Sequence, residues 1–329
     1  MSVVTAPDTL GTADAGGTGG GVTANRGRPD RGPRARGAAS RRFLVRGGLR
    51  LFTVVYLAML VAVPVGAIAY KAFAPGFSEA WRDLTNPEGL GTHDFVHALV
   101  LTLVVAAIAV PLNTVFGVGA AILLARHRFP GSRLLDAVID LPIAISPVVV
   151  GFSLLLVYDN TGWIGSWLAA RGIHIAFSIP GIVLASAFIS IPYVAREVLP
   201  VLQEIGTEQE QAAATLGAGP LQTLMRITLP SIRWGVAYGV TLTTARVLGE
   251  FGAVSVISGN IQGQTETLTL YVSNQFGNYN LVGAYMGGLV LAVIALMVLG
   301  LLSLSKRKES RSWRSKSAES PSGSETLSP

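Results

Sequence analysis

The chain alternates between long uncharged apolar stretches and shorter segments that hold most of its charges. Crossing the hydrocarbon layer of a membrane takes about 20 predominantly apolar residues in a helix. Six stretches approach or exceed this length: residues 51–70, 98–125, 141–158, 175–195, 231–258 and 281–305. Several contain proline, which a packed helical bundle tolerates because neighbouring helices satisfy the freed carbonyl groups. The pattern predicts an all-α integral membrane protein with six transmembrane helices.

The segments outside the stretches predict the organisation and the topology. Residues 1–48 contain few large apolar side chains, so we expect a disordered basic tail. Residues 49–305 form the six-span domain, and residues 306–329 form a polar tail. Of the 25 lysines and arginines, 21 fall in the tails, their flanks and two loops on the same side. Positive residues stay in the cytoplasm, so both termini are predicted to be cytoplasmic in a multi-pass protein of the cell membrane.

The composition supports this assignment and excludes several kinds of chemistry. Half of the 329 residues are hydrophobic and 13% are charged, whereas a soluble domain has about 25% charged residues. Membrane lipid is therefore the expected solvent, and the net charge of +6 follows topology and indicates no nucleic-acid partner. The absence of cysteine excludes disulfides and thiolate metal sites. His93 and His97 lack the glutamate of a zinc helix, so no metal site is predicted.

One cytoplasmic loop, residues 204–230, contains the helix start and stop signals of a helical hairpin. It reads EIGTEQEQAAATLGAGPLQTLMRITLP. Thr207 and Glu210 have the spacing of a capping box, which starts a helix. Gly217 suits the left-handed position that ends a helix. Pro220 suits the first turn of the next one. The loop is predicted to be a helix, a tight turn and a second helix.

The same loop has features of a docking element. Ala212, Ala213 and Ala214 give the first helix a face of small residues that another protein can approach closely. Leu229 precedes Pro230 and is expected to be extended. A surface hairpin without a partner is the alternative interpretation, but a docking hairpin can transmit rigid-body motion between packed elements.

The loop resembles a motif of the integral-membrane subunits of binding-protein-dependent ABC importers, E-A-A-x3-G-x9-I-x-L-P. The residues that match it are Ala212, Ala213, Gly217, Ile227, Leu229 and Pro230. Gln211 stands where the motif has glutamate. The resemblance implies a type I ABC importer permease whose coupling-helix hairpin contacts an ATP-binding subunit. The contacts it implies are Glu210, Gln211, Ala212, Ala213, Leu216, Gly217, Ile227, Leu229 and Pro230.

Residues 50–305 also resemble the CysW-type subunits of sulfate/thiosulfate importers, chiefly in the stretch GEFGAVSVISGN at 249–260. This resemblance implies transport of sulfate or thiosulfate with a second homologous permease and an external sulfate-binding protein. It also implies a dimer of ATP-binding subunits that carry ATP and Mg, with no cofactor on this chain. Molybdate, tungstate or phosphate permeases remain alternatives, as does an ATP-independent secondary transporter.

Sequence motifs agree that this chain is not the enzyme of such an assembly. It contains no G-x-x-x-x-G-K-[ST] segment, no G-x-S-x-G elbow and no H-E-x-x-H pair. No catalytic residue is therefore predicted, and ATP would be hydrolysed by a separate subunit.

Charges within the fifth stretch are candidates for the translocation path. Arg246 and Glu250 are four residues apart and can pair on a helix. Intramembrane charges usually face the bundle interior or a water-filled cavity, so a structural pair and a role in the anion path both remain open. Ser255 and Ser258 are further candidates, because hydroxyl groups can donate hydrogen bonds to an oxyanion.

Polar and aromatic residues in other segments favour structural roles. Asn113, in the second stretch, is expected to make an interhelical hydrogen bond. Trp81, Trp163 and Trp167 lie in or beside predicted outward loops, where tryptophan often anchors a protein at the membrane interface.

Overall fold

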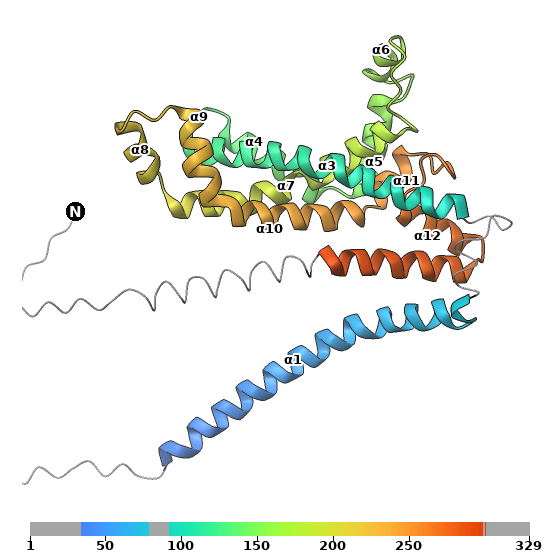
Figure 1. Ribbon diagram of the computed structural model, residues 1–329, viewed down its shortest axis with the longest axis horizontal. Coiled ribbons are helices and arrows are strands. Elements are labelled where there is room, and N and C mark those ends of the chain that lie inside the picture. The colour runs from blue at the N-terminus through green and yellow to red at the C-terminus, as the bar shows by residue number, and fades with distance from the viewer. Residues whose placement is uncertain (1–33, 79–91, 299, 301–329) are drawn as a thin grey trace, which may run out of the picture. The chain divides into compact units, whose positions relative to one another are not determined.

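The computed structural model describes residues 34–78, 92–298 and 300, and these are helical with no strand (Figure 1). The helices are α1 Arg34–Phe73, α3 Thr92–Arg126, α4 Ser132–Ala144, α5 Pro147–Tyr158, α6 Gly165–Ala169, α7 Ile179–Ile205, α8 Glu208–Thr215, α9 Pro220–Thr223, the π-helix η1 Leu224–Thr228, α10 Leu229–Leu248, α11 Gly252–Ile257 and α12 Leu268–Gly277. A last helix covers Leu281–Val298. The prediction of an all-α chain is confirmed.

The chain divides into two units, Met1–Met59 and Leu60–Pro329. α1 starts within the first unit at Arg34, so residues 34–48 are helical where the sequence predicted a disordered tail. The rest of that tail, residues 1–33, lies outside the described residues, as do Trp81 and the polar tail 306–329.

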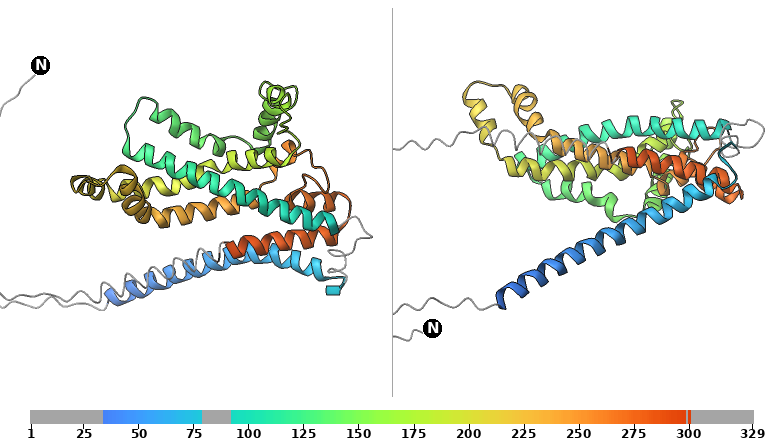
Figure 2. Two further views of the ribbon diagram at one scale, coloured as in Figure 1. Left: turned by 45° about the horizontal axis from the view of Figure 1, so that its top comes forward. Right: turned by 60° about the horizontal axis from the view of Figure 1, so that its bottom comes forward.

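Three long helices, α3, α7 and α10, form the centre of the second unit and lie side by side (Figures 1 and 2). Glycines permit the close approach of their backbones. A Cβ atom on Gly117 of α3 would lie 2.7 Å from the Cβ of Val194 in α7. A Cβ atom on Gly239 of α10 would lie 2.8 Å from the Cα of the same valine. Small residues let membrane helices pack this closely, so Val194 is held between two glycines and is fully buried.

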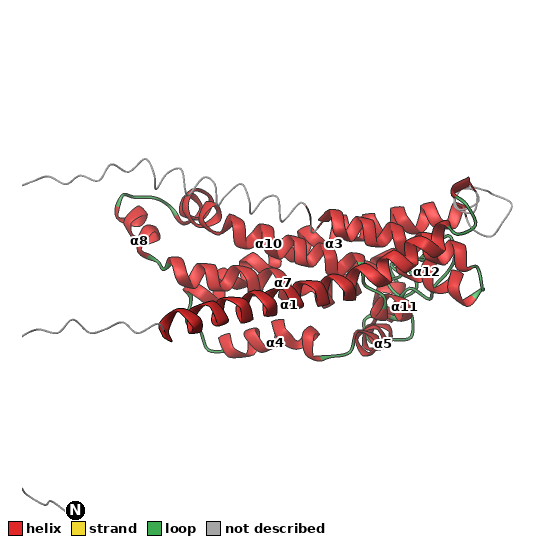
Figure 3. Ribbon diagram, turned by 90° about the horizontal axis from the view of Figure 1, so that it is seen from below, coloured by secondary structure: helices red, strands yellow, loops and turns green. Residues whose placement is uncertain are grey.

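The remaining elements cover this centre and divide between its two ends. α4 packs on α7, where Arg196 pairs with Asp136 at 2.9 Å and also with Asp140. α5 and α11 pack together, and α12 packs on α3, where the rings of Phe95 and Tyr271 meet edge to face. α11 and α12 lie at one end of the bundle and α8 lies at the opposite end (Figure 3).

Fewer helices meet the length and hydropathy expected of a span than the six predicted. Four do so among the described residues: Gly48–Phe73, Asp94–Arg126, Ile179–Ile205 and Leu281–Val298. A fifth span is counted if the bent pair α4 and α5 crosses as one. The described chain is therefore that of a multi-pass membrane protein with four or five helices of this kind.

The predicted third stretch, residues 141–158, is not a straight helix. α4 and α5 meet at 112°. Ile145 and Ser146 both have extended ψ angles, 140° and 132°, in front of Pro147, which starts α5. The break follows from Pro147, because its ring disfavours helical conformation in the residue before it.

The predicted fifth stretch, residues 231–258, is also interrupted. α10 ends at Leu248, and α11 starts at Gly252 after a short break. α10 has 20 residues, but it lacks the hydropathy expected of a membrane-spanning helix. Its composition explains this, because Arg233 and Arg246 are charged and several other residues are polar.

Candidate functional site

The hairpin predicted in residues 204–230 is present as α8 followed by α9. α8 ends in a Schellman motif, which satisfies the last carbonyl groups of the helix. The amide of Ala218 donates to the carbonyl of Ala213 at 3.0 Å, and the amide of Gly217 donates to the carbonyl of Ala214 at 3.0 Å. Gly217 has φ +84°, so the predicted left-handed position is confirmed. Pro220 occupies the first turn of α9, also as predicted.

The connection from the hairpin to α10 differs from the prediction. Leu229 has φ −59° and ψ −47°, so it is helical and not extended. The π-turn η1 precedes it, and the amide of Leu229 bonds to the carbonyl of Leu224. The wider turn shifts the hydrogen-bond ladder just before Pro230, whose missing amide and bulky ring would disrupt a regular α-helix. The helical path therefore continues from the hairpin into α10.

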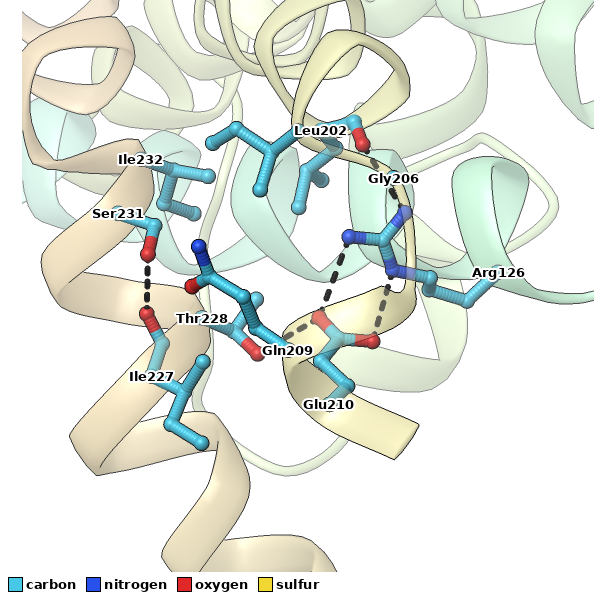
Figure 4. Close-up of a pocket in the computed structure, with 10 residues that line it drawn as sticks. Arg126, Leu202, Gly206, Gln209, Glu210, Ile227, Thr228, Ser231 and Ile232 are labelled. Carbon is cyan, nitrogen blue, oxygen red and sulfur yellow. Dashed lines mark hydrogen bonds and ion pairs between the residues drawn. The ribbon is translucent and has the colours of Figure 1, made fainter. Parts of the chain in front are cut away.

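An ion pair closes the root of the hairpin, where α8 meets the bundle (Figure 4). The Nε atom of Arg126, the last residue of α3, lies 3.0 Å from Glu210 Oε2. Its Nη2 atom donates to Glu210 Oε1 at 3.2 Å. Its Nη1 atom donates to the carbonyl of Leu202 in α7 at 2.9 Å. The hydroxyl of Thr228 in η1 also donates to Glu210 Oε1, at 2.9 Å.

These contacts replace the predicted capping box. Thr207 is the residue before α8, but its side chain makes no capping hydrogen bond. Its hydroxyl instead accepts a bond from the side-chain amide of Gln211, Nε2, at 3.1 Å. Glu210 does not return to the start of α8, because a guanidinium group offers it a two-pronged, charge-assisted partner.

The root is a packed joint and not a ligand pocket. The side chains of Arg126 and Glu210 are 10% and 22% exposed. The cavity around them holds about 10 Å³, roughly the space of one water molecule. Because the pair is largely shielded from solvent, its charges are screened less than those of a surface pair.

The tip of the hairpin is exposed and apolar. Leu216 is 88% exposed, Leu221 is 70% exposed and Met225 is 61% exposed. Exposed residues of the resembled motif lie on the same hairpin: Gln211, Ala212, Gly217 and Pro230. Its half-buried members are Ala213, Ile227 and Leu229, and Glu210, just before the motif, is half-buried as well. Large apolar side chains exposed together on a loop outside the spanning helices can mark a surface that another molecule covers.

Sequence reasoning missed Arg126 and Thr228 as members of this site. Glu210 is 84 residues from Arg126 in the sequence, so no helical spacing could have paired them.

The predicted path residues lie around the break between α10 and α11. Arg246 Nη1 lies 2.6 Å from Glu250 Oε2, so the predicted pair forms. Glu250 is 3% exposed, lies beyond the end of α10, and accepts a hydrogen bond from the backbone amide of Ala253 at 2.9 Å.

The two predicted serines bond within the same region. The hydroxyl of Ser255 donates to the carbonyl of Gly252 at 2.8 Å, and the buried hydroxyl of Ser258 accepts a bond from the amide of Asn260 at 3.1 Å. Both serines are thus engaged with nearby backbone.

Asn113 has the structural role expected of it. Asn113 donates to the carbonyl of Ala187 and to the hydroxyl of Ser190, both at 2.9 Å, so its interhelical bond is confirmed. Trp163 and Trp167 are 94% and 56% exposed near α6. Among the described residues, no three histidine, cysteine, aspartate or glutamate side chains could hold a metal ion together.

Comparison with known proteins decides the family. Residues 113–309 match the family described as the inner membrane component of binding-protein-dependent transport systems. The sulfate transport system permease protein CysW of Synechocystis sp. is 47% identical over 266 residues, which cover 81% of this chain and 94% of that protein. The chain therefore belongs to this family. The matched region includes the hairpin and its root, with both Arg126 and Glu210.

Other members of the family are similar over comparable lengths. The permease CysW of Escherichia coli K12 is 41% identical, and the match covers 80% of this chain and 88% of that protein. The permease CysT of the same organism is 37% identical, with 82% and 96% covered. In fold, the chain is similar to a chain of a bacterial ABC transporter that imports alginate, with TM-score 0.66 and 18% identity. That match covers 84% of this chain and 99% of the other.

Proposed function

We propose that this chain is the membrane-spanning permease subunit of an ATP-driven importer, and that its substrate is sulfate or thiosulfate. Membership of the family supports the transport role, and similarity to the sulfate permeases CysW and CysT supports the substrate. The observation that carries the mechanism is the hairpin. Its tip is exposed and apolar, whereas its root is joined to the bundle by the pair of Arg126 and Glu210.

The work is divided between subunits in this proposal. A dimer of ATP-binding subunits binds ATP and Mg, and it contacts the hairpin tip around Leu216. Closure of that dimer displaces the hairpin and, through it, the bundle. A second permease of the same family completes the pathway, and an external binding protein delivers the anion. CysW and CysT are two named kinds of sulfate permease among the relatives, which supports a paired arrangement.

The orientation follows from the same logic. The hairpin must face the cytoplasm, where ATP is available, and so must both termini. The distribution of lysine and arginine supports this arrangement. α11 and α12 lie at the opposite end of the bundle from α8 (Figure 3). In this orientation they lie on the side of the membrane that faces away from the cytoplasm.

Crosslinking tests the docking of the hairpin. The natural chain has no cysteine, so single cysteines can be introduced without background. In the assembled complex, Leu216→Cys should crosslink to the ATP-binding subunit. Trp163→Cys, at an even more exposed position in the loop before α6, is the matched control and should not. Crosslinking of Trp163→Cys but not of Leu216→Cys would contradict the proposal.

Uptake by the reconstituted complex tests the substrate and the energy source. Labelled sulfate should enter proteoliposomes only with ATP, and thiosulfate should compete. Stronger competition by molybdate, tungstate or phosphate would reassign the substrate. Uptake that continues without ATP but stops with a proton uncoupler would favour a secondary transporter.

Arg246 is the predicted path residue whose contacts best suit a role in anion passage. Its side chain is 28% exposed, whereas Glu250 is buried and both serines bond to backbone. We therefore expect Arg246→Ala to abolish sulfate uptake in a complex that still assembles. Uptake near that of the wild type would remove Arg246 from the path.

A further inference from the structure

We infer that Arg126 is a positioning residue that makes the hairpin and the inner ends of α3, α7 and α10 move as one body. The inference rests on the proposed function, because it concerns how a displacement of the hairpin reaches the bundle. It assigns a role to a residue outside the loop that the family motif covers.

The backbone alone holds α8 weakly. α8 has eight residues, and none of them is buried. Gly206 joins it to α7 with φ +69° and ψ −163°, a conformation that essentially only glycine adopts. Gly217 joins it to α9 with φ +84°. Glycine at both ends allows many orientations, since it has no Cβ atom to restrict the chain.

The ion pair supplies the missing constraint. One guanidinium group at the end of α3 contacts both carboxylate oxygens of Glu210 and the carbonyl of Leu202 near the end of α7. Glu210 in turn accepts the hydroxyl of Thr228, just before α10. Four elements of the fold, α3, α7, α8 and η1, therefore meet at one pair of side chains (Figure 4). A force on the exposed tip is transmitted to α3 through a planar two-pronged contact.

The geometry also indicates the role of the carboxylate of Glu210. The family motif has glutamate at the position of Gln211. The side-chain amide of Gln211 donates locally to the hydroxyl of Thr207. The carboxylate of Glu210, one residue earlier, points inward to Arg126 and is used within this chain (Figure 4). Glu210 is therefore inferred to serve the internal joint, which leaves docking to the exposed apolar tip.

The test is the number of sulfate ions transported per ATP hydrolysed by the complete complex in proteoliposomes. Arg126→Gln and Glu210→Gln should each lower this ratio by about 2- to 30-fold while ATP hydrolysis continues. The double variant should be no worse than either single variant, because both remove the same link. Arg126→Lys should recover little, since lysine cannot form the two-pronged contact.

Arg128→Gln is the matched control, because Arg128 is an exposed arginine two residues further along. It should leave the ratio unchanged. A normal ratio in Arg126→Gln would overturn the inference. So would a fall in the amount of assembled complex with a normal ratio, because that marks a purely structural role. Glu210→Gln nearly preserves shape, and if neither it nor Arg126→Gln assembles, the structural role is again assigned.

The wild-type complex separates this inference from the proposed function. ATP-driven sulfate uptake by the wild type establishes the function whatever the variants do. Absence of that uptake would remove the function, whereas equal ratios in wild type and variants would remove only the role of Arg126.

Discussion

Two arginine–glutamate pairs at different places in the bundle use the same chemistry for different purposes. Arg246 and Glu250 are four residues apart, and the pair closes the end of α10. Its glutamate is 3% exposed and also holds the first turn of α11 through the amide of Ala253. Arg126 and Glu210 are 84 residues apart, and the pair joins helices that no short segment connects. The first pair stabilises a local turn, and the second links the hairpin to the bundle.

The difference lies in what else could hold each region. Around α11 the backbone is confined by packing, because Ala253 and Ile257 are fully buried. α8 has no buried residue and is bounded by two glycines with positive φ. Loss of the buried pair should therefore affect stability most, whereas loss of the hairpin pair should affect coupling most.

Removal of the buried carboxylate should have the largest effect on stability. Glu250→Ala leaves Arg246 without its partner and removes the acceptor of the Ala253 amide. The expected loss is about 3 kcal/mol, near the lower end for a broken buried pair because Arg246 is 28% exposed. The Tm of the purified permease in detergent measures it. Glu250→Gln should lose less stability, because its amide oxygen can still accept the hydrogen bond from the Ala253 amide. An unchanged Tm in Glu250→Ala would contradict the structural role of the pair.

A side chain at the hairpin turn should have the next largest effect. Gly217→Val forces a branched residue to φ +84°, which costs about 1–2 kcal/mol or more. Gly219→Val is the matched control, since Gly219 has φ −71° and ψ 160° and no atom would lie within 4 Å of its Cβ. Tm and stimulated ATPase activity should fall only for Gly217→Val. Equal behaviour of the two variants would show that the left-handed turn does not matter for docking.

A double-mutant cycle compares the two pairs directly. We expect the coupling energy of Arg126 and Glu210 to be about 1 kcal/mol, because their side chains keep some contact with solvent. The cycle on Arg246 and Glu250 should give a larger value, since Glu250 is buried. Added salt should weaken the first pair more than the second. Thermal unfolding of the wild type, the four single variants and the two double variants at low and high salt measures both values, and a reversed order would contradict the comparison.

A third glutamate, without an arginine partner, should have the smallest effect. Burial raises the pKa of the Glu266 carboxyl, which is 1% exposed and lies in the loop before α12, outside the helices counted as spans. Asn274 donates to its Oε1 atom at 2.6 Å and lowers the pKa, Asp94 raises it, and His97 lowers it.

The sign of the pH dependence follows from that shift. The folded protein holds the proton more tightly than the unfolded chain, so the contribution of Glu266 to stability is full at low pH. It is lost as pH rises above the ordinary value of 4.5 and through the folded pKa. Glu266→Gln, which mimics the protonated form, should reduce the fall of Tm with rising pH. Identical slopes of Tm between about pH 4 and pH 8 would show that Glu266 does not cause this dependence.

Local features of the fold and the site could be predicted because they depend on neighbouring residues. Apolar length predicted the helices from Asp94 and from Ile179, although their bounds differ from the expected ones. Glycine after a run of helix formers predicted the turn at Gly217, and four-residue spacing predicted the contact of Arg246 with Glu250. Each of these patterns acts within one or two turns of a helix, where spacing in sequence is spacing in space.

The tertiary structure decided the features in which distant residues compete for the same group. Glu210 had the spacing of a capping residue, but α3 brings Arg126 to it, and a charged two-pronged partner wins over a backbone amide. Leu229 stays helical before Pro230 because η1 widens the turn. The sequence by itself thus determined the apolar helices and the hairpin turn, whereas only packing of the helices decided what anchors the hairpin. The physical reason is that a contact between residues 84 positions apart leaves no periodic trace in the chain.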